Sequence, residues 1–114
     1  MEHKNIDPHE AINYLYTHGQ KYAQAKANQT YLEEFRKTKK SILMKSAMLN
    51  GCKSIAAAEM EAYADVEYVV VLEGIKAAVE VTVGLYWGLM AAQARIDVYR
   101  SMEASNRRMD RATT

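Results

Sequence analysis

The stretch VEYVVVLEGIKAAVEVTVGLYWGLMAAQARIDVY, residues 66–99, decides the fold that this sequence predicts. Its apolar side chains recur every three or four residues, which is the period of an α-helix. One apolar line consists of Tyr68, Leu72, Ile75, Val79, Tyr86, Leu89 and Ile96. A second line, rotated from the first, consists of Val71, Ile75, Ala78, Leu85, Leu89, Ala92, Ile96 and Tyr99. We expect one helix from residue 66 to residue 108.

A β-strand is the competing prediction for part of this stretch. The segment VEVTV, residues 79–83, is rich in β-branched residues and alternates between apolar and other side chains. It lies inside a much longer helical pattern, which favours the helix. Gly84 and Gly88 each cost a helix about 0.8–1 kcal/mol relative to alanine. Their spacing of four allows close approach of another helix, so we expect local packing there, with a hinge as the alternative.

A second long helix is predicted before this one, from residue 8 to residue 49. Asp7, Pro8 and Glu10 form a helix-start signal, with a capping side chain, a proline at the first helical position and an acidic third position. Asn50-Gly51 then predicts a tight turn. A restart of the helix at residues 28–30 is the alternative, because Thr30 and Glu33 have capping-box spacing.

A short helix, residues 54–64, links the two long ones. Ser54 is positioned to cap its start, and Asp65 is positioned to cap the helix that follows. The predicted fold is therefore all-α, a long antiparallel hairpin of two long helices and a short linking helix. We expect one domain over residues 1–114, with residues 1–7 flexible and residues 109–114 frayed.

The two apolar lines on the last helix make its apolar face wide. One partner helix covers only one such stripe, and an exposed patch of this size usually marks an interface. We therefore expect a homo-oligomer, most simply two hairpins pairing as a four-helix bundle. The predicted interface residues are Leu85, Leu89, Ala92 and Ile96.

Composition excludes several classes of protein. A net charge of +1 gives no overall attraction to polyanions, so any nucleic-acid binding depends on a local patch. The single cysteine excludes an intramolecular disulfide. Glu73, Lys76 and Glu80 interrupt the most apolar run, which argues against a membrane span. The polar N-terminus lacks the apolar segment of a secretory signal, so we expect a soluble protein of the cytoplasm.

No catalytic or metal-binding pattern is present. His3, His9 and His18 have no ligand spacing, and the Glu-x-x-His pairs of di-iron bundles do not occur. The glutamate pairs lack the arrangement of magnesium-dependent hydrolases, and Cys52 has no histidine near it in sequence. We expect no catalytic residue, no metal and no cofactor.

Two basic clusters remain as candidate binding features. The first is Arg36, Lys37, Lys39, Lys40 and Lys45. In an antiparallel hairpin it lies near the acidic residues 59–73, which we expect to neutralise it. The second is Arg95, Arg100, Arg107, Arg108 and Arg111, for which few acids are near. Arginine's planar guanidinium favours phosphate and carboxylate recognition. The competing interpretation is a solvated helix end whose cations suit the helix dipole.

The sequence resembles a family of small helical proteins of temperate bacteriophages and prophages. The segments that carry the resemblance are YLEEFRKTKKSILMK (31–45), AEMEAYADVEY (58–68) and AAQARIDVYRSMEASNRRMDRAT (91–113), and it extends over residues 14–113. The resemblance implies expression in a bacterial host during phage development, from early regions near recombination and replication genes. It supplies no catalytic residues. This chain departs from it at VEVTVGLYWGLM (79–90), which bears on the choice of partner.

These observations lead to two functional hypotheses. The first is a non-enzymatic accessory factor of phage DNA recombination or replication, which binds DNA or a DNA-processing protein through the arginine cluster. The second is a protein-interaction module that modulates or inhibits a host enzyme or defence complex through its apolar face or through the acidic residues 59–73. A small hydrolase is disfavoured by the missing motifs.

Overall fold

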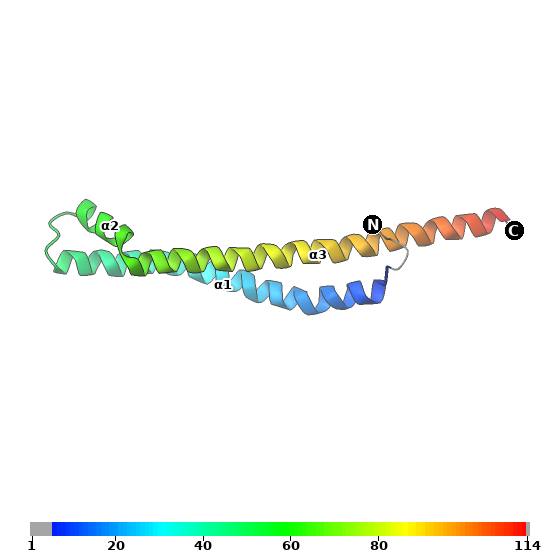
Figure 1. The fold of residues 1–114 in the computed structure, drawn as a ribbon, viewed down its shortest axis with the longest axis horizontal. Coiled ribbons are helices and arrows are strands. Elements are labelled where there is room, and N and C mark those ends of the chain that lie inside the picture. Colours follow the sequence, from blue (N-terminus) through cyan, green and yellow to red (C-terminus); the bar gives the residue numbers. More distant parts are fainter. Residues whose placement is uncertain (1–5, 114) are drawn as a thin grey trace. The chain divides into compact units, whose positions relative to one another are not determined.

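The computed structural model describes residues 6–113, and every regular element in that range is an α-helix. α1 spans Pro8–Leu49, α2 spans Ile55–Ala64 and α3 spans Val66–Thr113 (Figure 1). The all-α prediction is confirmed. Residues 79–83 lie inside α3, so the long helical period overrides the β-branched character of that segment.

The first predicted cap and the predicted turn are both present. The Asp7 carboxylate accepts hydrogen bonds at Oδ1 from the backbone N–H of His9, at 2.9 Å, and of Glu10, at 3.3 Å. These bonds satisfy two backbone donors that have no partner within the first turn of α1. Gly51 has a φ of 113°, a conformation that L side chains rarely adopt, and this ends α1 at the predicted place.

Side-chain capping also starts the other two helices. Ser54 Oγ accepts from the backbone N–H of Ala57 at 3.1 Å, at the start of α2. Asp65 Oδ1 accepts from the backbone N–H of Glu67 at 2.8 Å, at the start of α3. Both caps were expected from the sequence, because serine and aspartate oxygens replace the missing backbone acceptors of a first helical turn.

α1 continues without a break through residues 28–30. Glu33 does not cap a restart there, because its Oε1 accepts a hydrogen bond from Gln29 Nε2 at 2.8 Å, one turn earlier on the same helix. α3 runs to Thr113, past the predicted end at residue 108. Residues 1–5 and 114 lie outside the described residues, so flexibility of residues 1–7 and fraying of residues 109–114 stay predictions.

The chain forms two compact units, and both long helices contribute to each. Residues 24–82 form one unit, and residues up to 23 together with those from 83 onward form the other. Within the first, the end of α1 and the start of α3 run antiparallel, and Lys39 Nζ lies 3.2 Å from Glu67 Oε1. Within the second, the start of α1 runs antiparallel to α3, and the ring centroids of Tyr22 and Tyr86 are 6.4 Å apart.

Mostly small side chains fill the interior of both units. The buried alanines are Ala11, Ala58, Ala62, Ala78 and Ala92, and the larger buried apolar residues are Leu43 and Tyr68, 7% and 8% exposed. Many large apolar side chains of the described residues are exposed instead. No described helix combines the length and the apolarity that crossing a bilayer requires.

Candidate binding surface at the end of α3

The end of α3 is the most exposed helical segment of its unit. Ile96 and Tyr99 are half-buried, whereas every residue from 105 to 112 is exposed. Figure 1 shows α3 continuing past the start of α1 at Pro8, so no other described helix covers this segment. The absence of glycine and proline after Gly88 explains why the helix nevertheless continues.

The structure brings three of the five predicted arginines together. Arg107, Arg108 and Arg111 line one shallow pocket of about 310 Å³ with Ala104. Arg108 Nη2 donates to Ser105 Oγ at 3.5 Å, one turn earlier on the same helix.

Arg100 belongs to the same face, and Arg95 does not. Steps of seven and four residues return to nearly the same angle on a helix, so Arg100, Arg107 and Arg111 lie along one line. The step from Arg95 to Arg100 rotates by about 140°, at about 100° per residue. Arg95 instead lines a pocket with Tyr14 of α1 and with Gly88. All five arginines are exposed.

The other basic cluster has different surroundings. Lys39 Nζ lies 3.2 Å from Glu67 Oε1, and Lys40 Nζ lies 3.3 Å from Glu59 Oε2. Lys40 also lies over the Tyr63 ring, 4.6 Å from its centroid. A hydrogen bond with Tyr63 raises the pKa of Lys40 above its ordinary value of 10.5; desolvation opposes that rise, and Glu59 adds to it. The prediction that acids of the same chain neutralise this cluster is confirmed at both lysines.

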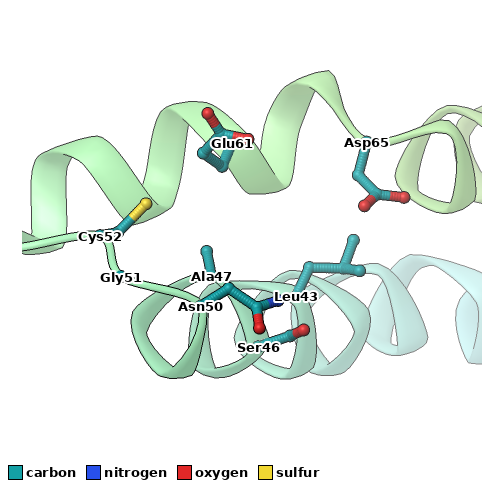
Figure 2. A pocket seen from close by; sticks show the side chains of 8 residues that line it. All are labelled: Leu43, Ser46, Ala47, Asn50, Gly51, Cys52, Glu61 and Asp65. Carbon is teal, nitrogen blue, oxygen red and sulfur yellow. The ribbon is translucent and has the colours of Figure 1, made fainter.

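One pocket with a polar lining lies at the turn between α1 and α2. It has a volume of about 400 Å³, and Cys52, Glu61 and Asp65 are among its lining residues (Figure 2). Figure 2 shows Cys52 at the loop end of this pocket and Asp65 at the other. Asp65 already caps α3 through Oδ1, and no histidine lines the pocket to activate the Cys52 thiol. The pocket therefore holds the Cys52 thiol and two carboxyl groups, without an imidazole beside the thiol.

The predicted oligomer-interface residues lie on the side of α3 that packs against α1. Ala92 is 3% exposed, and Leu85, Leu89 and Ile96 are half-buried in the single chain. Together with half-buried Tyr99 they alternate at spacings of four and three, which is the pattern of two helices packed as a coiled coil.

Sequence reasoning missed the apolar residues on the opposite side of α3. These are Val83, Trp87, Met90 and Val98, with exposed fractions of 46%, 64%, 41% and 38%. We call them the outer stripe. The heptad pattern of the sequence could have revealed this second apolar side. If Leu85, Leu89 and Ala92 face α1, position 87 must face away from it. The two overlapping apolar lines concealed this phase, since both pass through Ile75, Leu89 and Ile96.

Among residues 6–113 there is no group of three histidine, cysteine, aspartate or glutamate side chains placed to hold a metal ion. No protein-family model matches the chain, and neither curated proteins nor solved structures give a match.

Proposed function

We propose that this protein is a non-enzymatic binding protein that contacts nucleic-acid phosphates with the arginine end of α3. One observation carries the proposal: Arg100 and Arg107 are exposed, and Arg107 lies in the run of exposed residues that ends α3, whereas Lys39 and Lys40 are paired within the chain. Guanidinium groups bind phosphate oxygens in a planar, two-point geometry, and arginines one or two turns apart along a helix suit a phosphate backbone.

The biological setting belongs to the same proposal. We propose that it acts in the cytoplasm of a bacterial host as an accessory factor of phage DNA recombination or replication, which is the setting that the resemblance of its sequence implies. The alternative is a protein-interaction module that acts on a host enzyme or defence complex. In that alternative the exposed outer stripe binds the host protein instead of a second copy of the chain. Binding of a host protein through the acidic residues 59–73 has less support, because Glu59 and Glu67 are already paired with lysines of the same chain.

Self-association, most simply as a dimer, is also part of the proposal. The single chain buries mainly alanine side chains and leaves large apolar ones exposed, including Trp87 at 64%. Large apolar side chains that recur at helical spacing on an exposed face are typical of an interaction surface.

A salt titration of DNA binding tests the arginine surface. Fluorescence anisotropy would follow labelled single-stranded and double-stranded oligonucleotides over a series of salt concentrations. Each phosphate contact releases counterions, so the double variant Arg100→Ala/Arg107→Ala should flatten the slope of log K against log salt by about two units, one per lost contact.

A matched control is available on α1. Lys21 and Lys26 are also exposed, so Lys21→Ala/Lys26→Ala removes the same charge from another surface and should leave the slope unchanged. Equal losses in the two variants would show that overall charge, not the arginine end, binds DNA. A wild-type protein that binds neither oligonucleotide at low salt would exclude the nucleic-acid function and leave the protein-interaction alternative.

A further inference from the structure

α3 carries apolar side chains on two opposite sides, and only one of them is covered. Leu85, Leu89 and Ala92 occupy the a and d positions of a heptad that packs against α1. In that heptad, Trp87 and Ala94 are both f positions, directly opposite, and both are exposed. A central helix with two apolar sides is typical of a bundle in which a second helix covers the outer one.

We propose that the outer stripe binds the outer stripe of a second copy, antiparallel, about a two-fold axis between Met90 and Ala91. This inference rests on the proposed self-association and adds its surface, its orientation and its register. A two-fold interface requires that, if one residue contacts another across it, the same pair also meets in the reverse sense.

Side-chain volumes are complementary in this register. Val83 lies opposite Val98, and Trp87, the largest side chain of the outer stripe, lies opposite the small Ala94. Met90 lies opposite Ala91 on the axis. Because Ala91 and Ala94 are exposed and small, they leave room for the indole and the thioether of the other copy.

Charges along α3 select the antiparallel orientation. Glu73 and Arg108 lie on the same heptad line as Trp87, fourteen residues before it and twenty-one residues after it. The same register places Glu73 of one copy opposite Arg108 of the other. A parallel pair would instead place like charges opposite each other at both positions, which is unfavourable.

The arginine face proposed to bind phosphate remains accessible in this dimer. Arg107 is one residue from Arg108, so it is rotated by about 100° from the line of the outer stripe. Arg100 shares the Arg107 side, seven residues earlier. The dimer therefore assigns Arg108 to self-association and presents two copies of the Arg100–Arg107 face.

Disulfide cross-linking tests the register. In a Cys52→Ser background, Val83→Cys and Val98→Cys are made as separate variants, mixed and mildly oxidised. The antiparallel register predicts a cross-linked dimer from the mixture and little from either variant alone. Efficient cross-linking of each variant alone would show a parallel pair and overturn the register. Leu89→Cys, which faces α1, serves as a control that should not cross-link between copies.

Sedimentation equilibrium tests the surface separately. Trp87→Glu should raise the dimer dissociation constant by at least about 100-fold, because a buried central aromatic is the kind of residue that dominates an interface. Helical content measured by circular dichroism should not change. Tyr16→Glu places the same charge on α1 at a side chain that is 77% exposed, and it should leave the dimer intact.

The experiments distinguish a failure of the proposed self-association from a failure of the proposed interface. A monomeric wild-type protein at micromolar concentration would remove both the self-association and this inference. A stable dimer that tolerates Trp87→Glu would overturn the outer stripe alone and leave self-association standing.

Discussion

The two basic clusters each hold five cationic side chains, and their surroundings differ. Lys39 and Lys40 are half-buried, and each forms an ion pair with a glutamate from α2 or α3. Arg100 and Arg107 are exposed, and Arg107 lies in the run of exposed residues 105–112 that ends α3. A run of cations therefore does not identify a binding surface by itself. The acids and the aromatic ring beside Lys39 and Lys40 come from α2 and α3, so the folding of the chain decides the surroundings of that cluster. The contrast between these covered lysines and the exposed arginines gives three predictions.

The largest expected difference is in the free energy of unfolding, when one apolar side chain near each basic cluster is replaced by alanine. Leu43, 7% exposed, packs in a cluster with Ala62 and Tyr68, so Leu43→Ala should lower the free energy of unfolding by about 2–4 kcal/mol. Met109, 66% exposed, should change it by less than about 0.5 kcal/mol when replaced by alanine. Urea denaturation followed by circular dichroism measures both. Equal losses would mean that the arginine end is as well packed as the lysine end.

Replacing Gly84 or Gly88 of α3 by alanine should change the stability by an intermediate amount. The two glycines differ in whether another side chain covers them. No atom lies within 4 Å of a Cβ built at Gly84, so Gly84→Ala should stabilise the helix by about 0.5–1 kcal/mol. A Cβ at Gly88 would collide with the Tyr14 hydroxyl and lie 3.3 Å from Cζ. Tyr14 also stacks on His18, with centroids 3.8 Å apart, so its displacement would break that stack.

Gly88→Ala should therefore be less stable than Gly84→Ala in thermal unfolding, although both changes have the same intrinsic helix propensity. If the two variants have equal melting temperatures, Tyr14 does not cover Gly88 in solution.

The smallest effect is a pH dependence at Lys40. Because Tyr63 and Glu59 raise the pKa of Lys40 above 10.5, the folded state holds this proton more tightly than the unfolded state. Its contribution to stability is complete below that ordinary pKa and is lost as the pH rises through the raised value. The stability difference between wild type and Lys40→Gln should thus be constant near neutral pH and shrink in strongly alkaline solution.

A series of thermal melts at increasing pH measures that difference. Lys21→Gln, at an exposed position on α1, is the control and should show no such dependence. A Lys40→Gln difference that stays constant into strongly alkaline solution would contradict the raised pKa.

Local sequence determined where the three helices start and where α1 ends. Asp7, Ser54 and Asp65 accept hydrogen bonds from backbone N–H groups two or three residues later, and Gly51 takes a conformation that depends on its own missing side chain. Such interactions span only a few residues, so they could be read from the sequence. The helical period of residues 66–99 was likewise strong enough to exclude a strand at 79–83.

Only the tertiary structure decided which side of α3 is covered. Ile75, Leu89 and Ile96 fit both apolar lines, so the periodicity alone left the phase of the helix ambiguous. Packing against α1 resolved it, because Ala92 and its heptad neighbours face inward and Trp87 then faces outward. The contact of Tyr14 with Gly88 likewise joins residues distant in sequence. The spacing of apolar residues determines which side chains share one face of a helix. Which face packs against another helix depends on the volumes and charges of side chains that come into contact only when the chain folds back.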